Sequence, residues 1–296
     1  MGRGYAVASV GYRLSGDAPF PAQIEDVRAA VRWLRANAAR YNLDPDRVGT
    51  WGSSAGGHLV ALLGTDGGEK ASRVQAVCDF FGPTDLVQMA RTPGYERHAS
   101  ADSPESKLIG GPVLENRDKA ARANPIAFVD RADPPFLIVH GDRDPVVPPG
   151  QSRLLFDALK KAAVPVRLHT LRGAGHGGVG FSAPETTEMV AAFFDRTLKG
   201  RPGPAGTTEA RLTESDAAPT GGGAAAGTQP RPPARPPWDA VLARRDADRD
   251  GRLSRAEFPG PLPLFARLDR DGDGFLTRAE FEAAPPLPRP GRGGLE

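Results

Sequence analysis

The sequence lacks the features that mark several large classes of protein. It contains one cysteine, Cys78, in 296 residues, which excludes an internal disulfide framework. Its formal net charge is +2 at pH 7, so no strong field of one sign points to nucleic acid or to an anionic membrane surface as a partner. No apolar run approaches membrane-spanning length, and the apolar segment 5–10 is too short for a signal peptide. The length of the chain is sufficient for one domain of catalytic size and a smaller module.

Strand and helix patterns alternate along the first 199 residues. The patterns predict strands over residues 5–12, 47–51, 74–81, 136–140 and 166–171. They predict helices over residues 22–39, after Ser54, and over 151–163 and 185–198. This alternation indicates an α/β domain with a largely parallel sheet. The periodicity fades between residues 89 and 128, which we interpret as an excursion over the active-site face that carries specificity.

The composition changes sharply after residue 199. Residues 200–237 are rich in Gly, Pro, Ala and Thr and contain almost nothing to bury, so we predict a disordered linker there. A small α-helical module is predicted over residues 238–284, and a disordered tail over 285–296.

A candidate nucleophile stands in the stretch Trp51-Gly52-Ser53-Ser54-Ala55-Gly56-Gly57-His58, which contains G-x-S-x-G. An apolar strand leads in and an apolar helix leads out. In this context, Gly52 and Gly56 leave room for a sharp turn that raises the Ser54 hydroxyl above the sheet edge. The turn places Ser54 at a helix N-terminus, where backbone N–H groups favour negative charge.

Two further strand ends supply partners for this serine. The stretch His140-Gly141-Asp142-Arg143-Asp144 closes one strand, so Asp144 or Asp142 could supply a carboxylate. His176 lies among glycines in the loop after the next strand. The order Ser54, Asp, His176 is that of a serine hydrolase triad, in which the imidazole transfers the serine proton and the carboxylate orients the imidazole. We expect His58 and His140 to lie outside the triad.

Residues 1–199 resemble the alpha/beta-hydrolase esterases of the hormone-sensitive-lipase-like and acetyl-xylan and feruloyl esterase group. The resemblance rests on the elbow, on Gly173-Ala174-Gly175-His176 and on the matching stretches Tyr12-Arg13-Leu14-Ser15, Phe20-Pro21-Ala22-Gln23, Phe81-Gly82-Pro83-Thr84-Asp85 and His140–Pro148. It implies that Asp144 is the acid, with Asp142 as the alternative. It also implies hydrolysis of carboxylic esters, including acetyl or feruloyl esters of polysaccharides, without a cofactor for catalysis.

The sequence departs from that group in one feature. Members of the group carry an earlier strand that ends in a His-Gly-Gly-Gly-type loop, which donates part of the oxyanion hole, and this sequence has no such motif. The Ala55 backbone N–H is the one oxyanion donor that we identify, and loss of a second donor costs about 2.7–4 kcal/mol of transition-state stabilisation. Because Ser54, Asp144 and His176 are all intact, we expect an N-terminally incomplete esterase whose natural start lies upstream, rather than a decayed fragment.

The C-terminal module repeats a twelve-residue pattern of oxygen donors. Its two stretches, 246–257 and 269–280, resemble EF-hand loops, with Gly251 and Gly274 at the sharp turn. Calcium is the expected ion at both sites. The predicted ligands are Asp246, Asp248, Asp250, Arg252 (through its carbonyl), Ser254 and Glu257 in the first loop, and Asp269, Asp271, Asp273, Phe275, Thr277 and Glu280 in the second. The close spacing of the loops favours calcium-stabilised folding or docking on a protein partner over a sensor that opens a groove.

Three functions remain open at this point. The first is a serine esterase with a calcium module, acting on a small-molecule or polysaccharide ester outside the cytoplasm, its signal peptide upstream. The second is a serine peptidase or an arylformamidase with the same elbow and triad order. The third is a catalytically impaired hydrolase domain joined to a calcium-dependent docking module.

Overall fold

A computed structural model describes residues 3–66, 68–202, 208–213, 238–246, 250–254, 257–258, 268–271 and 273–283. The chain divides into two compact units, Met1–Thr220 and Gly221–Glu296. Within the described residues, no helix is long and apolar enough to cross a membrane. The predicted tail 285–296 and most of the predicted linker lie outside the described residues.

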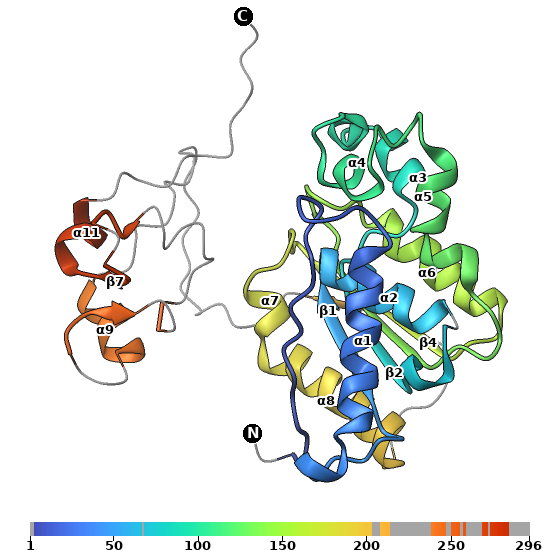
Figure 1. Cartoon of the computed structure of the whole chain (residues 1–296), viewed down its shortest axis with the longest axis horizontal. Coiled ribbons are helices and arrows are strands. Elements are labelled where there is room, and N and C mark those ends of the chain that lie inside the picture. The colour runs from blue at the N-terminus through green and yellow to red at the C-terminus, as the bar shows by residue number, and fades with distance from the viewer. Residues whose placement is uncertain are drawn as a thin grey trace, which may run out of the picture. The chain divides into compact units, whose positions relative to one another are not determined.

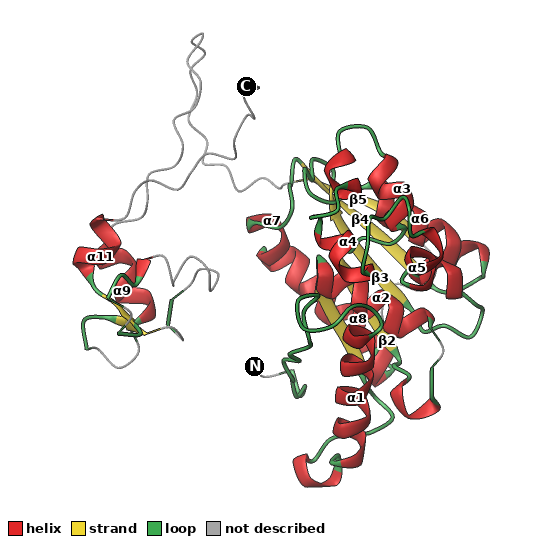
Figure 2. Cartoon of the chain, turned by 45° about the horizontal axis from the view of Figure 1, so that its top comes forward, coloured by secondary structure: helices red, strands yellow, loops and turns green. Residues whose placement is uncertain are grey.

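The first unit is built around a parallel sheet with helices on both faces (Figures 1 and 2). The strands lie in the order β1-β2-β3-β4-β5, and every neighbouring pair is parallel. The elements of this unit are α1 (Ala22–Ala36), η1 (Ala39–Tyr41), β1 (Gly49–Ser53), α2 (Ala55–Thr65), η2 (Lys70–Ser72), β2 (Ala76–Phe80), α3 (Leu86–Arg91), η3 (Glu96–Ala99), α4 (Pro104–Ile109), α5 (Arg117–Arg122), η4 (Pro125–Phe128), β3 (Phe136–Gly141), α6 (Gly150–Lys161), β4 (Val166–Arg172), α7 (Val179–Ser182), α8 (Pro184–Lys199) and β5 (Thr208–Thr213). The predicted α/β class is confirmed.

Two hydrophobic clusters hold the helices to the sheet. One face of the sheet packs against α1, α2 and α6, and the other packs against α7 and α8. Every residue of β2 and β3 is buried, as expected for central parallel strands covered on both faces. A third cluster fills the interior of the excursion, where α3, α4 and α5 gather at one end of the sheet (Figure 1).

Two parts of the expected sheet differ from the structure. Residues 5–12 form no strand, and this segment contacts a helix instead: the Tyr5 hydroxyl donates to Asp195 on α8 at 2.8 Å. Strand β5 pairs with β4 inside the range 200–237 that we predicted to be disordered, so that prediction is wrong for Thr208–Thr213. The edge of β4 that does not face β3 carries backbone N–H and C=O groups. A following strand can bond these groups whatever its side chains are.

The second unit contains a pair of short antiparallel strands between helices. Its described elements are α9 (Trp238–Arg245), β6 (Leu253–Ser254), β7 (Phe275–Leu276) and α11 (Arg278–Ala283). Leu253 pairs with Leu276, and both side chains are fully buried together with Trp238 and Phe281. These leucines occupy equivalent positions of the two predicted loops, so the strands join the loops into one module.

Candidate active site

Ser54 stands in a strained turn between β1 and α2. Its backbone angles are φ 54° and ψ −121°, a conformation that L side chains rarely adopt and that is typical of functional turns. A Cβ on Gly52 would lie 2.2 Å from the Gly56 carbonyl oxygen, so only glycine fits at that position. A Cβ on Gly56 would meet nothing within 4 Å, whereas a Cβ on Gly57 would lie 2.4 Å from Asp79 Oδ1. The expected steric role therefore belongs to Gly52 and Gly57 rather than to Gly52 and Gly56.

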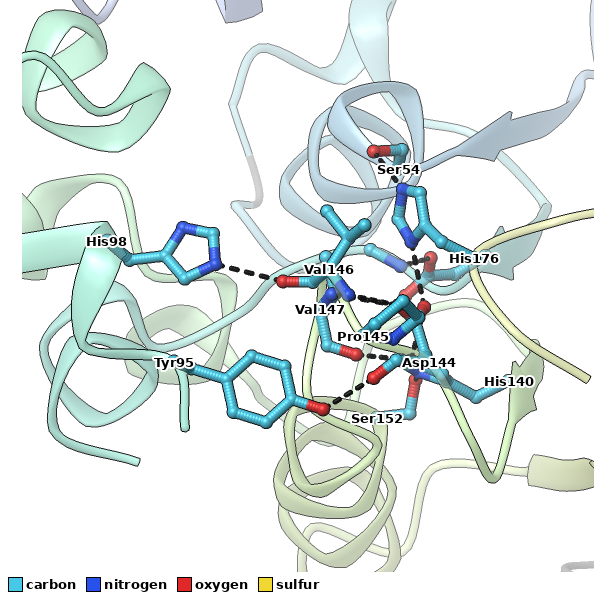
Figure 3. A network of polar contacts seen from close by, with 12 residues as sticks. Ser54, Tyr95, His98, His140, Asp144, Pro145, Val146, Val147, Ser152 and His176 are labelled. Carbon is cyan, nitrogen blue, oxygen red and sulfur yellow. Dashed lines mark hydrogen bonds and ion pairs between the residues drawn. The ribbon is translucent and has the colours of Figure 1, made fainter. Parts of the chain in front are cut away.

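Ser54, His176 and Asp144 form one chain of hydrogen bonds (Figure 3). The Ser54 Oγ lies 2.9 Å from His176 Nε2, and His176 Nδ1 lies 2.7 Å from Asp144 Oδ2. The three residues follow β1, β3 and β4, so the parallel sheet delivers them to the carboxyl ends of its strands. An imidazole between a hydroxyl and a carboxylate can accept the hydroxyl proton while the carboxylate stabilises the positive charge.

The structure brings Asp144 to the histidine and keeps Asp142 away from it. Asp142 is exposed, and its Oδ1 accepts a hydrogen bond from the Gly173 N–H at 2.6 Å. Asp144 is 1% exposed. Of the two carboxylates that the sequence left open, Asp144 therefore has the position of a triad acid.

Four donors surround the buried Asp144 carboxylate. Its Oδ1 accepts the N–H groups of Val146 and Val147 at 2.7 and 3.0 Å, and its Oδ2 faces both His176 and His140. Burial alone would raise the pKa of Asp144, but the hydrogen bonds from the two imidazoles and the two amides outweigh it and hold the pKa well below its ordinary value. The carboxylate is therefore ionised at any pH at which the site would work.

His140 contacts the acid, which the sequence analysis did not foresee. Its Nε2 lies 3.0 Å from the Val147 carbonyl oxygen and 3.2 Å from Asp144 Oδ2, and its Nδ1 lies 2.6 Å from Ser152 Oγ on α6. This pattern assigns the proton to Nε2 and leaves Nδ1 as the acceptor of the serine hydroxyl. The one feature of the sequence that could have indicated this contact is the position of His140 four residues before Asp144. His58 is buried and bonds the Pro83 carbonyl oxygen, outside the chain of Ser54, His176 and Asp144.

Phe81 is a second neighbour that the sequence did not reveal. Its ring meets the His176 imidazole edge-on, with the ring centroids 4.6 Å apart. Phe81 also has a positive φ of 45°, which is unusual for a bulky residue. The aromatic ring restricts the positions that the His176 ring can occupy.

Ala55 is the first residue of α2, next to the nucleophile. The first backbone N–H groups of a helix have no partner within that helix, so the Ala55 N–H is free to bond an oxyanion. Ala55 is exposed, and its role as the oxyanion donor stays a prediction.

The candidate metal centre of the second unit lies in the loop 269–280. Asp269, Asp271 and Asp273 each offer a carboxylate oxygen, and these oxygens lie within 4.8 Å of one another. Gly274 has a φ of 86°, and its N–H bonds Asp269 Oδ2 at 3.1 Å, so the loop folds around its acidic residues. Hard carboxylate oxygens gathered in this way fit Ca²⁺.

The first loop has the same geometry where it is described. Gly251 has a φ of 82°, and its N–H bonds Asp246 Oδ2 at 3.0 Å. Glu257 accepts from Ser254, as Glu280 accepts from Thr277 in the second loop. Asp248 lies outside the described residues. The remaining predicted ligands of both loops lie in the described part of the module, namely Asp250, Arg252 and Phe275.

The parallel sheet, the elbow and the hydrogen-bonded Ser54, His176 and Asp144 define an alpha/beta-hydrolase. The family model BD-FAE matches residues 1–159, more than half of the chain, and the chain belongs to that family. A separate model, described as EF hand, matches residues 263–283.

Named relatives agree with this class. Esterase LipQ of Mycobacterium tuberculosis is 30% identical over 64% of this chain and 46% of its own length. A solved truncated form of a carbohydrate esterase from gut microbiota is 36% identical, with a TM-score of 0.60 over 64% of this chain and 73% of that one. An acetyl ester-xyloside bifunctional hydrolase from Caldicellulosiruptor lactoaceticus is 25% identical, with a TM-score of 0.53 over 62% and 69% of the two chains. The chain spans about half the length of the first curated relatives that it matches.

Proposed function

We propose that this chain is a serine esterase that hydrolyses carboxylic esters through Ser54, His176 and Asp144. The observation that carries the proposal is the continuous chain of hydrogen bonds from Ser54 Oγ to His176 and from His176 to the buried Asp144. Ser54 attacks the acyl carbon while His176 takes its proton, and His176 then returns a proton to the leaving alcohol. The Ala55 N–H bonds the oxyanion of the tetrahedral intermediate. A water molecule then attacks the acyl group on Ser54, with His176 again taking and returning a proton, and the carboxylic acid product is released.

We further propose an acetyl or feruloyl ester of a polysaccharide as the substrate. The sequence resemblance supports this class, as do the carbohydrate esterase and the acetyl ester-xyloside hydrolase among the similar structures. A secreted or extracytoplasmic location would give the enzyme access to such a polymer, and this location is part of the proposal.

The test compares Ser54→Ala with the matched pair Asp144→Asn and Asp142→Asn. The substrates are acetylated xylan, methyl ferulate and p-nitrophenyl acetate. Ser54→Ala and Asp144→Asn should each lower kcat by about 10³–10⁴-fold or more, because the triad acts as a unit. Asp142→Asn removes only an exposed charge, because the amide oxygen can still accept the Gly173 N–H, and it should stay within about threefold of the wild type. A fluorophosphonate should label the wild type at Ser54. Wild-type protein that neither turns over these esters nor takes the label would refute the proposal and favour the binding-protein alternative.

A peptidase is the second candidate for the same residues. A puromycin-hydrolyzing peptidase of Mycobacterium tuberculosis has a similar structure, with 28% identity and a TM-score of 0.50. Aminoacyl-nitroanilides and formyl-kynurenine, assayed beside the esters, separate the peptidase and arylformamidase alternatives from the esterase. Turnover of an amide or formamide faster than every ester would reject the esterase proposal.

We propose that the second unit binds two calcium ions through the loops 246–257 and 269–280, for stability or for docking on a protein partner. The gathered carboxylates of Asp269, Asp271 and Asp273 and the paired strands β6 and β7 support it. Calorimetric titration of the full chain with Ca²⁺ should show two sites, and Asp271→Asn should weaken or remove one of them. No heat of binding at millimolar Ca²⁺ would refute the calcium proposal.

A further inference from the structure

The excursion contacts the turn that carries the triad acid. We define the acid turn as Asp144–Val147 and the clamp segment as Tyr95–His98. The Tyr95 hydroxyl donates to the Asp144 carbonyl oxygen, and the Arg97 guanidinium donates to the carbonyl oxygens of Pro145 and Val146. His98 Nε2 lies 2.9 Å from the Val146 carbonyl oxygen (Figure 3). Three successive carbonyl groups of the acid turn thus have donors in one short segment of the excursion.

Outside the clamp segment, the acid turn is held by His140, whose Nε2 bonds the Val147 carbonyl oxygen, and by few backbone hydrogen bonds. Pro145, Pro148 and Pro149 lack an N–H, so the segment cannot be fixed by a regular backbone ladder. Of its three amides, that of Asp144 donates to the Gly141 carbonyl oxygen, and those of Val146 and Val147 both bond Asp144 Oδ1. The direction of the carboxylate is therefore coupled to the backbone of the turn. A shift of this backbone moves the carboxylate relative to His176.

Packing adds a second link between the excursion and the acid turn. The Val147 side chain is 3% exposed and belongs to the hydrophobic cluster inside the excursion, together with Met89 and Ile109. A side chain buried in that cluster cannot leave it without exposing apolar surface. The excursion therefore holds the turn by its carbonyl groups and by one apolar side chain.

His98 is buried and joins the acid turn to Glu105 on α4. It is 4% exposed, and its Nδ1 lies 2.9 Å from Glu105 Oε2 on α4. Both of its partners are hydrogen-bond acceptors, so the ring needs a proton on each nitrogen. The hydrogen bond to Glu105 raises the pKa of His98 above its ordinary value, although burial opposes the shift. Ser103, which caps α4, also donates to the His98 carbonyl oxygen at 3.0 Å.

We propose that Tyr95 and the His98–Glu105 pair are positioning residues for the triad acid: they fix the acid turn so that the Asp144 carboxylate points at His176. This inference rests on the proposed esterase function. It gives the excursion a role in the catalytic step itself, in addition to any role in choosing the substrate. The clamp segment touches the carbonyl groups of the acid turn, and it acts on the reaction only through Asp144.

The experiment measures kcat, KM and the pH profile of four variants of the full chain on p-nitrophenyl acetate. Tyr95→Phe removes one hydroxyl and keeps the ring. Glu105→Ala removes the partner of His98, whereas in Glu105→Gln the amide can donate to Nδ1 of a neutral His98 and leave Nε2 protonated for Val146. Lys107→Gln is the matched control, because Lys107 lies on the same helix with its side chain 55% exposed.

We expect a loss in kcat without a loss in substrate binding. Glu105→Ala should lower kcat by about 10–100-fold and Tyr95→Phe by about tenfold, with KM within about twofold, because small misplacements of catalytic groups are costly. Glu105→Gln should recover kcat to within about threefold of the wild type, and Lys107→Gln should match it. His140, His176 and Tyr95 are the titratable groups that influence Asp144. In Glu105→Ala the acid limb of the kcat/KM profile should move to lower pH, since a displaced carboxylate stabilises the imidazolium less.

Each contrary result has a defined meaning. Thermal unfolding confirms first that every variant is folded at the assay temperature. Wild-type kcat in both Tyr95→Phe and Glu105→Ala would overturn the inference, as would a change confined to KM. Equal losses in Glu105→Gln and Glu105→Ala would also overturn it, because the rescue would have failed. An inactive wild type that does not react with a fluorophosphonate would instead refute the proposed function itself.

Discussion

Asp79 is a buried carboxyl group that the proposed mechanism does not use. It lies on β2 and is 0% exposed. Its Oδ1 accepts the Gly82 N–H at 2.9 Å, whereas its Oδ2 has no hydrogen-bond partner within the described part of the chain. Burial raises the pKa of Asp79 to about 6, although the Gly82 N–H and His140 oppose the rise. We therefore expect Asp79 to make the stability of this unit depend on pH.

The sign and size of this effect follow from linkage. The folded pKa of about 6 lies above the ordinary value of 3.8, so the folded state keeps a proton that the unfolded state has released. Stability from this group is fully present below the ordinary pKa and is lost as the pH rises toward 6. Each unit of pKa shift corresponds to about 1.36 kcal/mol, so the total loss is roughly 3 kcal/mol.

Substitution Asp79→Asn removes the titration and keeps the shape of the side chain. The free energy of unfolding of the variant, minus that of the wild type, should rise by about 3 kcal/mol between pH 4 and pH 7 and then level off. Denaturant unfolding at each pH, with calcium held constant, measures this difference. Asp144→Asn is the contrast: because the pKa of Asp144 is lowered, its difference should change only below about pH 4. A difference for Asp79→Asn that is constant from pH 4 to pH 7 would refute the reasoning.

Three further predictions concern the elbow, the acid and the second unit. Gly52→Ala should destabilise the fold by about 3 kcal/mol or more in denaturant unfolding, whereas Gly56→Ala, with open space at its Cβ, should be neutral or stabilising by up to about 1 kcal/mol. His140→Gln should lower kcat by about tenfold at unchanged KM, because it removes the imidazole that contacts Asp144 Oδ2; an unchanged kcat would show that this contact does not position the acid. Calcium removal with EDTA should unfold residues 238–284, seen by circular dichroism, and leave ester turnover nearly unchanged; loss of turnover on chelation would contradict independent units.

The sequence predicted most of the fold because the sheet is built from regular patterns. The buried strands β2 and β3 are mostly apolar, with Asp79 and His140 as their polar residues, and the helices that cover them carry apolar residues at helical spacing. The two misses have opposite causes. Residues 5–12 have a strand composition but bond to helices, and Thr208–Thr213 has a loop-like neighbourhood but meets the edge of β4. In both cases the presence or absence of a partner strand, which lies far away in the sequence, decides the outcome.

The candidate triad was also predictable, since each member stands in a local motif. Ser54 lies in its elbow, His176 lies among glycines, and the choice between Asp142 and Asp144 needed only the resemblance. The steric role of Gly57 was not predictable, because it depends on Asp79 on the neighbouring strand. A contact between a helix and a distant strand cannot be seen in a local motif such as the elbow.

The contacts around Asp144 could not be predicted from the sequence for a further physical reason. The groups that accept hydrogen bonds from Tyr95, Arg97 and His98 are backbone carbonyls, which every residue carries. The donors lie 48 or 49 residues from these carbonyls in the chain. A pattern of residue types can mark a donor, but it cannot mark a carbonyl acceptor. A motif therefore identifies the groups that react, whereas the groups that hold them in place emerge only from the folded backbone. This is why the excursion, which from its sequence shows only a loss of periodicity, carries in the structure the contacts that orient Asp144.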